Sequence, residues 1–408
     1  MSIEHVQTGT SMPERREALA GRWLSSVFGR LGCGTLHLAV GDAKTQAYQG
    51  ALPGPAAAMR LHRPWRLAAR LLARGDVGLA EGYMAGDWES PGLADLVTLL
   101  AINEESFGRP GQGSTGARLF DRLQHALRRN DRRGSRRNIA FHYDLGNAFY
   151  HLWLDPGMAY SAAVFADPGE PLEVSQERKY AQVLARLGAR PGERLLEIGC
   201  GWGGFAEYAA SRGFHVTGVT LSREQLDYAR QRIAAAGLTD RVDLRLQDYR
   251  DLEGQFDHVV SIEMFEAVGE AYWPDFFATL QRCMRAGGRA SLQVITLDAA
   301  RFDTYRARAD FIQKYIFPGG MLPSVPAFVA AATAAGLHVG EPAFHGADYA
   351  KTLECWDQAF MRARADITRL GFDERFFRMW RYYLAYCEAG FRTGRIDLMQ
   401  IALERPAS

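Results

Sequence analysis

Three glycines with a regular spacing mark the clearest candidate binding site in this sequence. Gly199, Gly201 and Gly203 lie in EIGCGWGG (197–204), at the end of the short apolar run RLLEIGC (194–200). Glycine lets the backbone turn tightly and approach a ligand over the carboxyl end of a strand. A turn without a ligand is the alternative, but glycines at these spacings are costly unless something comes close to the backbone. We therefore predict a cofactor over this turn.

Residues that follow the next two apolar runs narrow the class of cofactor. Thr220 lies near the end of HVTGVTL (215–221), where enzymes that use NAD usually place an acidic residue for the ribose hydroxyls. A nicotinamide cofactor is therefore disfavoured. Asp248 follows VDLRLQ (242–247), and we predict that it binds an adenine amino group, with a plain turn residue as the alternative.

Alternating strands and helices must position these residues. Helical periodicity separates apolar runs that predict strands at 194–200, 215–221, 242–247, 257–264 and 290–297. A helix is expected at 273–286, with Gly287 and Gly288 as its stop signal. This alternation predicts an α/β fold with a parallel, doubly wound sheet.

The N-terminal part has a different pattern. Helical periodicity from Trp65 to Ala101 predicts a small, mainly helical domain over residues 1–110, to which 36–40 adds one strand. A Gly-, Ser- and Pro-rich stretch at 106–116 is typical of a linker. We predict three parts, which are this domain, a linker and basic segment, and a catalytic domain, at 1–110, 111–137 and 138–408.

Charge and composition exclude several classes of partner. The 48 basic and 47 acidic side chains of the 408 residues nearly cancel, so the net charge gives no argument for nucleic acid. RRNDRRGSRR (128–137) is the one strong charge cluster, and we expect it to attract anionic lipid headgroups, with a solvated helix face as the alternative. Five scattered cysteines without a C-x-x-C pair predict reduced thiols and no metal site.

The distribution of apolar residues bears on localisation. Charges run through the first thirty residues, and nowhere do eighteen apolar residues follow one another. We expect a cytoplasmic protein without a signal peptide or membrane span. If its substrate is a lipid, it must act as a peripheral protein on the inner face of the membrane.

Several longer motifs extend well beyond generic cofactor binding. They are NIAFHYDLGNAFYHLWLDPGMAYS (138–161), FEAVG (265–269), KYIFPGG (314–320) and GADYAKTL (346–353). Over roughly residues 138–405 the chain resembles the cyclopropane-fatty-acyl-phospholipid synthases and the related mycolic acid cyclopropane synthases. The resemblance implies a Rossmann-like class I methyltransferase with helical lipid-binding insertions. It also implies methyl transfer from S-adenosylmethionine to the double bond of an unsaturated acyl chain of a membrane phospholipid, forming a cyclopropane fatty acid.

The implied reaction makes demands on the pocket. An alkene is a poor nucleophile, so positioning, exclusion of water and stabilisation of a transient carbocation must supply the catalysis. Aromatic faces suit such a cation, and the motifs offer Phe141, Tyr143, Tyr315 and Phe317 as substrate-pocket residues, beside Tyr160. Each of these aromatic residues could instead belong to an ordinary core.

Ring closure needs a base, which the resemblance implies is a bound bicarbonate. By motif position its holders would be Glu266, Tyr349 and the carbonyl of Ile295. Two positions depart from the family pattern, since Ala162 replaces a cysteine and Gln293 replaces a histidine. Gln293 can still donate a hydrogen bond, so it stays among the predicted catalytic residues. If the base is misplaced, the carbocation formed by methyl transfer would lose a different proton, and the product would be a methyl-branched unsaturated chain.

The predicted cofactor contacts gather around the glycine turn and the ends of the neighbouring strands. They are Tyr160, Ser161, Glu197, Gly199, Gly201, Gly203, Thr220, Leu221, Ser222, Gln225, Gln247, Asp248, Tyr249 and Ser261. Two other functions stay open, namely a small-molecule N- or O-methyltransferase and a binding protein that has lost its chemistry. A homodimer is left open as well.

Overall fold

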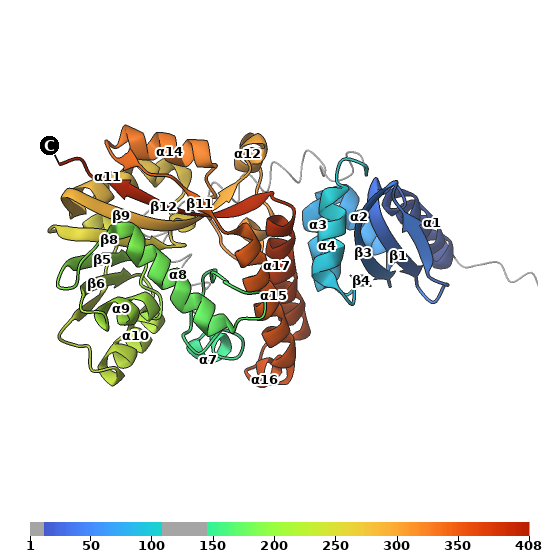
Figure 1. Cartoon of the computed structure of the whole chain (residues 1–408). Helices are drawn as coiled ribbons and strands as arrows, with labels where there is room; N and C mark the ends of the chain where they lie inside the picture. Colours follow the sequence, from blue (N-terminus) through green and yellow to red (C-terminus); the bar gives the residue numbers. More distant parts are fainter. Residues whose placement is uncertain (1–11, 108–144, 408) are drawn as a thin grey trace, which may run out of the picture. The chain divides into compact units, whose positions relative to one another are not determined.

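The computed structural model describes residues 12–107 and 145–407 of the chain (Figure 1). The chain divides into two compact units. The first contains Met1–Leu119 and Glu374–Tyr382, and the second contains Phe120–Asp373 and Tyr383–Ser408. The predicted boundary near residue 110 and the basic segment 128–137 lie outside the described residues.

The first unit combines helices with a small sheet. Its elements are α1 (Met12–Phe28), β1 (Cys33–Val40), β2 (Gln46–Gln49), β3 (Leu52–Leu61), α2 (Pro64–Arg74), α3 (Asp76–Met84), β4 (Trp88–Glu89) and α4 (Leu93–Ile102). The four strands have the order β2-β1-β3-β4, in which β1 and β3 run parallel. The helical prediction holds for 64–84 and 93–102, and the strand predicted at 36–40 lies inside β1. The other three strands were missed. The longest of them, β3, is rich in Ala, Gly and Pro, which have a low strand propensity.

The second unit is built on an eight-stranded sheet, which confirms the doubly wound prediction. Its strands are β5 (Arg194–Ile198), β6 (His215–Thr220), β7 (Val242–Leu246), β8 (Phe256–Ile262), β9 (Met284–Leu297), β10 (His338–Val339), β11 (Ala343–Phe344) and β12 (Ile396–Glu404). The order is β10-β12-β9-β8-β5-β6-β7, with β11 paired to β12. The strands from β7 to β9 are parallel, and β12 adds an antiparallel partner to β9.

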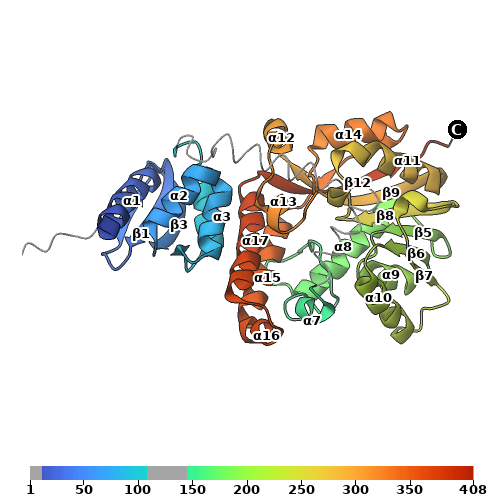
Figure 2. The same ribbon diagram turned by 180° about the vertical axis from the view of Figure 1, so that it is seen from behind.

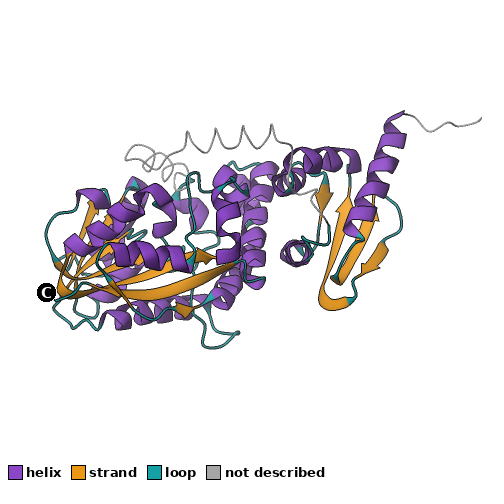
Figure 3. Ribbon diagram, turned by 90° about the horizontal axis from the view of Figure 1, so that it is seen from above, coloured by secondary structure: helices purple, strands orange, loops and turns teal. Residues whose placement is uncertain are grey.

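Helices cover both faces of this sheet (Figures 1 and 2). The helices from residue 145 onward are α7 (Asn147–Tyr150), α8 (Leu172–Leu187), α9 (Gly204–Ala210), α10 (Arg223–Ala235), α11 (Trp273–Cys283), α12 (Ala299–Arg306), α13 (Phe311–Tyr315), α14 (Val325–Ala334), α15 (Gly346–Arg362), α16 (Arg364–Arg369) and α17 (Glu374–Arg392). The first half of α17 belongs to the first unit. α8, α9 and α10 pack on one face, while α11 and α14 pack on the other. Figure 3 shows the sheet between these helical layers.

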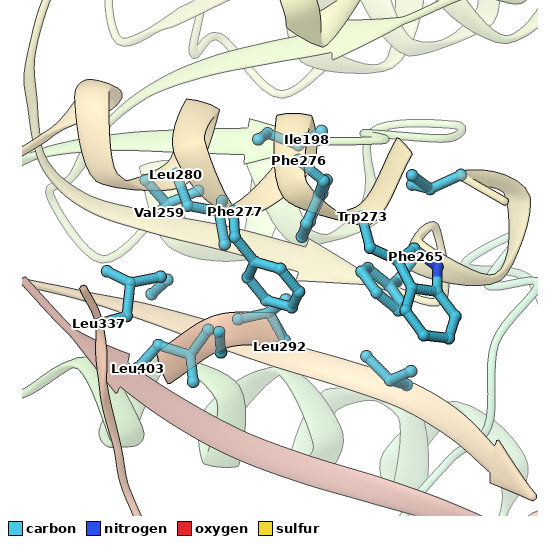
Figure 4. Close-up of a cluster of buried hydrophobic side chains, with 14 of the residues drawn as sticks. Ile198, Val259, Phe265, Trp273, Phe276, Phe277, Leu280, Leu292, Leu337 and Leu403 are labelled. Carbon is cyan, nitrogen blue, oxygen red and sulfur yellow. The ribbon is translucent and has the colours of Figure 1, made fainter. Parts of the chain in front are cut away.

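Alternate residues of a strand supply the two cores. Leu195 of β5 packs with α8, α9 and α10, whereas Leu196 and Ile198 face α11 and α14. The same alternation separates Val260 from Val259 on β8, as the two-residue period of a strand requires. Figure 4 shows the α11 side, where aromatic rings such as Phe277 fill the space above the sheet.

One element boundary was predicted wrongly. The helix expected at 273–286 ends at Cys283, and β9 starts at Met284, so Gly287 and Gly288 lie inside a strand. The register between β8 and β9 shifts at this point, because Phe256 pairs with Met284 and His258 pairs with Arg289, so the two glycines lie in an irregular part of the strand. None of the described helices is long and apolar enough to cross a membrane.

Candidate active site

The glycine turn that follows β5 leaves its middle residue open to a ligand. Gly199, Gly201 and Gly203 all have positive φ, at 88°, 50° and 80°. A Cβ at Gly199 would meet Met264 at 2.9 Å, and one at Gly203 would meet Ala229 at 3.0 Å. A Cβ at Gly201 would meet nothing within 4 Å. Two glycines therefore allow close packing of the turn, and Gly201 presents bare backbone to open space, as a cofactor site needs.

Glu197 places a carboxyl group beside this turn. The residue is only 3% exposed, and its Oε2 atom has no hydrogen-bond partner among the described residues. Burial raises the pKa of Glu197 to about 8, although the positive charges of Lys179 and Arg232 oppose this shift. S-adenosylmethionine has an ammonium group at its methionine end, so this orphaned oxygen and the open turn fit that cofactor.

A local network fixes the end of β6. The Ser222 hydroxyl caps α10 by accepting the Gln225 backbone N–H at 3.2 Å, and the Thr220 hydroxyl bonds Gln225 Oε1 at 3.0 Å. All three side chains are buried. The residues predicted here do come together, with Leu221 between them, and their side chains shape the turn from Thr220 to Ser222.

Asp248 has a structural role in addition to the predicted one. Its side chain caps the turn Tyr249–Asp251 and forms an ion pair with Arg250 at 2.7 Å. The side-chain amide of Gln247 donates to the Asp251 carbonyl at 2.8 Å. Similarly, the Ser261 hydroxyl donates to the Ile198 carbonyl at 3.0 Å and ties β8 to β5. These side chains hold the loops in place, and a role of Asp248 at adenine stays a prediction.

A carboxylate that the sequence did not single out occupies the centre of the site. Glu263 Oε1 accepts hydrogen bonds from the Ala162 backbone N–H at 2.8 Å and from Gln293 Nε2 at 2.7 Å. Glu263 Oε2 accepts from the Tyr349 hydroxyl at 2.6 Å. We call Ala162, Gln293 and Tyr349 the cradle. Glu263 has φ of 50°, a left-handed conformation that costs a side-chain-bearing residue on the order of 1 kcal/mol.

Bicarbonate does not fit this cradle. Tyr349 and Gln293 were among its expected holders, and both donate to Glu263 instead, as does the backbone N–H of Ala162. The carboxylate of the protein itself thus takes the place that the resemblance assigned to a bound ion.

Gln293 is oriented by a chain of hydrogen bonds that crosses the sheet. Gln400 of β12 donates through Nε2 to Gln293 Oε1 at 2.9 Å, and Arg186 Nε donates to Gln400 Oε1 at 3.3 Å. Because its oxygen accepts from Gln400, the amide of Gln293 must turn its nitrogen toward Glu263. Gln293 and Gln400 are fully buried, so this orientation is held away from water.

A buried lysine supports the other side of the cradle. Lys179 Nζ donates to the Ser161 hydroxyl at 2.6 Å and to Gln176 Oε1 at 2.7 Å. Gln176 in turn donates to the Ser161 carbonyl at 2.8 Å, so the backbone that leads into Ala162 is held from both directions. Desolvation lowers the pKa of Lys179 to about 8, although the negative charge of Glu263 opposes this shift.

Glu266 lies next to Glu263 in a drier position. Its Oε1 accepts the Ile295 backbone N–H at 2.5 Å, and its Oε2 is buried without a hydrogen-bond partner among the described residues. Desolvation, followed by the charge of Glu263, raises the pKa of Glu266 to about 8. Burial also raises the pKa of Glu263, but three donors and Lys179 oppose that rise. Three donors and Lys179 therefore favour the ionised form of Glu263, whereas Glu266 has a single donor and the charge of Glu263 against it.

Aromatic rings surround the cradle. The Tyr160 hydroxyl lies 2.8 Å from that of Tyr383, and the Tyr160 ring packs within 5.5 Å of the Trp153 and Trp356 rings. Phe317 packs edge-on against Tyr383 at 6.2 Å. Tyr315 instead packs on Phe311, and Phe141 and Tyr143 lie outside the described residues. Of the predicted pocket aromatics, Phe317 joins the cluster around Tyr160.

Sequence reasoning missed Glu263, Lys179, Gln400 and Tyr383. Glu263 did leave a signal, because SIEMFE (261–266) places a second carboxylate directly after a buried strand. Lys179, Gln400 and Tyr383 belong to a helix, a strand and a helix far apart in the sequence, and no local pattern connects them with residue 263. Among the described residues, no group of three or more His, Cys, Asp and Glu side chains could hold a metal ion.

Comparison with known proteins agrees with this geometry. Residues 130–401 match the family model described as mycolic acid cyclopropane synthetase. A tuberculostearic acid methyltransferase of Mycobacterium tuberculosis is 43% identical over 375 residues, which cover 87% of this chain and 85% of that protein. The cyclopropane-fatty-acyl-phospholipid synthase of Escherichia coli is 38% identical over 344 residues, covering 82% and 85%.

A solved structure extends the likeness to the fold. The mycolic acid cyclopropane synthase CmaA1, complexed with SAH and CTAB, superposes with a TM-score of 0.62 at 32% identity. The match covers 66% of this chain and 98% of that one. With its glycine turn, its orphaned Glu197 and these relatives, the chain belongs to the mycolic acid cyclopropane synthetase family and is an S-adenosylmethionine-dependent methyltransferase.

Proposed function

We propose that this enzyme methylates the double bond of an unsaturated fatty acyl chain in a phospholipid and that Glu263 accepts the proton released. The observation that carries this proposal is the Glu263 carboxylate, held by three donors beside a cluster of aromatic rings. An N- or O-methyltransferase has a nucleophile with a lone pair and does not need such a lining for a carbocation. The family relatives named for fatty acyl products support the same substrate class.

The chemistry of each group follows from its position. S-adenosylmethionine supplies an electrophilic methyl group when it is bound. The aromatic cluster around Tyr160 excludes water and presents ring faces to the positive charge that methylation leaves on the acyl chain. Glu263 then removes one proton from the chain, so that the net change is the addition of one CH2 unit. Lys179 and the cradle lower the pKa of this carboxylate against the effect of burial, and the three donors of the cradle hold it in place.

The product that the site favours is a methyl-branched unsaturated chain. The departures from the family pattern at Ala162 and Gln293 both fall on residues that hold the Glu263 carboxylate, while the glycine turn keeps its three glycines. A carboxylate anchored to its own backbone has less freedom to follow the new methyl group than a small bound ion has. The second candidate is ring closure to a cyclopropane. The motif set alone favours this product, and Glu263 is an oxyanion that could remove the proton as bicarbonate would.

The test is turnover on unsaturated phospholipid vesicles with labelled S-adenosylmethionine. We expect label in the acyl chains and a product that is one CH2 unit heavier and still reacts with an alkene-specific reagent. A product that no longer reacts as an alkene would indicate the cyclopropane. Label found only in small amines or alcohols, and never in lipid, would contradict the proposal.

Replacing Lys179 by methionine should move the acidic limb of the pH–rate profile to higher pH. The charge of Lys179 lowers the pKa of Glu263, so without it the carboxylate is protonated at a pH where the unaltered enzyme still has an active base. The rate at neutral pH should fall and recover as the pH rises. The measurement is kcat against pH at saturating cofactor.

Arg178→Met is the matched control for this change. It removes a positive charge from the neighbouring residue, whose ion pair is with Glu170 outside the cradle. We expect Arg178→Met to leave the limb where it is. If the acidic limb of the pH–rate profile does not move in Lys179→Met, Lys179 has a packing role and no electrostatic effect on Glu263.

Replacing Gln400 by leucine should lower kcat by about tenfold to a hundredfold, because Gln293 loses the donor that fixes its orientation. The check is a double-mutant cycle with Gln293→Leu, which removes the amide itself. In that background the further change Gln400→Leu should have little effect on kcat. Additive losses would mean that Gln400 acts elsewhere, for example by packing in the sheet.

A further inference from the structure

The outer face of α1 in the first unit mixes apolar and basic side chains. Met12, Arg16 and Leu19 follow one another at helical spacing, and Arg22 continues the stripe one turn later. Met12 is 70% exposed and Leu19 is 59% exposed. The carboxylate of Glu17 accepts a hydrogen bond from the backbone N–H of Trp65 at 2.8 Å. Large apolar groups thus stand in solvent with arginines between them.

α2 presents a second stripe of the same kind. Trp65 and Leu72 are seven residues apart and so share one side of the helix, with exposures of 48% and 60%. Arg66 is exposed beside them. α2 (Pro64–Arg74) has no acidic residue along its length.

A direct contact joins the two stripes into one surface. The guanidinium carbon of Arg16 lies 5.9 Å from the centroid of the Trp65 ring, and the Glu17 bond to Trp65 fixes the two helices at the same point. We call the surface made of these residues the α1–α2 face. Its members are Met12, Arg16, Leu19, Arg22, Trp65, Arg66 and Leu72.

We propose that the α1–α2 face docks on an anionic phospholipid bilayer. Leucine, methionine and tryptophan side chains enter the boundary between headgroups and acyl chains, while arginines bind phosphates. The inference rests on the proposed function, since an enzyme that modifies phospholipid acyl chains must reach a bilayer. The basic segment 128–137, which the sequence singled out for this task, is a separate candidate and lies outside the described residues.

The composition of the face favours a membrane over a protein partner. The seven members of the face carry three positive charges and no negative one, so the face complements an anionic lipid surface. Arg16 and Arg22 lie three residues on either side of Leu19, and Arg66 follows Trp65, which suits a surface where phosphates neighbour acyl chains. The cation–π contact between Arg16 and Trp65 can persist at the boundary between lipid headgroups and acyl chains.

The test is vesicle sedimentation of the full chain carrying Arg16→Glu, Arg22→Glu and Arg66→Glu. Vesicles of phosphatidylglycerol and phosphatidylethanolamine with unsaturated chains are the probe, and phosphatidylcholine vesicles are the neutral comparison. The unaltered enzyme should bind the anionic vesicles, and the triple variant should lose binding by about tenfold or more. A second variant, Leu19→Ser with Leu72→Ser, should weaken the binding that persists at high salt.

Matched controls separate this face from charge in general. Arg223→Glu, Arg241→Glu and Arg369→Glu change three exposed arginines of the second unit and should leave sedimentation unchanged. Changing the six arginines of 128–137 to alanine tests the rival segment. The proposal is overturned if the α1–α2 variant binds like the unaltered enzyme, if neutral vesicles bind as well as anionic ones, or if light scattering shows that the variant instead dissociates a dimer.

Turnover measurements keep this inference distinct from the proposed function. On phospholipid dispersed in detergent the triple variant should methylate acyl chains at the normal rate, and on anionic vesicles it should be slow. Sedimentation needs no turnover, so an enzyme that binds anionic vesicles through this face but methylates no lipid would refute the proposed function alone. Equal turnover of variant and unaltered enzyme on vesicles would refute the docking face alone.

Discussion

Glu263→Gln should lower kcat by about a hundredfold to ten-thousandfold, the usual contribution of a general base. The amide keeps the size and shape of the side chain but cannot accept the proton from the methylated acyl chain. The affinity for S-adenosylmethionine should stay nearly unchanged, because Glu263 faces the cradle and not the glycine turn. The measurements are single-turnover methylation of unsaturated phospholipid and calorimetric titration of the cofactor.

Glu263→Gly separates the chemical role from a structural one. Glycine accepts the φ of 50° without strain, so the substitution relieves backbone strain at residue 263. At the same time Tyr349 and Gln293 lose the carboxylate that accepts their hydrogen bonds. In bicarbonate-free buffer, formate should enter the emptied cradle and restore part of the rate. Glu270→Gln, which alters a carboxylate paired with Arg306 outside the cradle, should keep the normal rate. A Glu263→Gln enzyme with normal kcat would remove Glu263 from the mechanism.

Gly201→Val should raise the dissociation constant for S-adenosylmethionine by about tenfold to a hundredfold, the effect expected from forcing a side chain into a fitted contact. A Cβ at Gly201 meets no protein atom, so the loss should come from the space where the cofactor lies. Titration calorimetry gives the constant directly, without turnover.

Gly237→Val provides the matched control. Gly237 also has a positive φ, 68°, and open space at its Cβ position, but it follows α10 away from the glycine turn. In both variants a valine is forced into a positive φ, so both should lose a similar amount of thermal stability. Only Gly201→Val should lose the cofactor. Equal affinities in the two variants would place the cofactor elsewhere.

Local patterns were sufficient to predict the five parallel strands of the second unit. Short β-branched and leucine-rich runs, separated by amphipathic helices, gave β5, β6, β7, β8 and the later part of β9 to within a few residues. The glycine turn was predictable for the same reason, since its spacing determines where backbone can approach a ligand. The start of β9 was not, because Met284 to Gly288 has no strand pattern and is held by pairing with β8.

The centre of the site depended on contacts that no local pattern records. Gln293 and Tyr349 were correctly brought together by motif position, but the acceptor between them was taken for an ion. A positive φ at a glutamate cannot be read from composition, since tertiary contacts must impose it. Likewise the Arg250 partner of Asp248 and the Gln400 partner of Gln293 became visible only with the fold.

The measurement that tests the central claim most directly is mass spectrometry of the lipid product made with S-adenosylmethionine whose methyl group is fully deuterated. If Glu263 takes a proton from a chain carbon, the product keeps all three deuterons and an alkene. If the proton comes from the new methyl group, one deuteron is lost, and the product is a cyclopropane or, when a hydride shift first moves the positive charge to the methyl-bearing carbon, an exocyclic methylene. We predict retention of all three, and loss of one in every turnover would contradict the account.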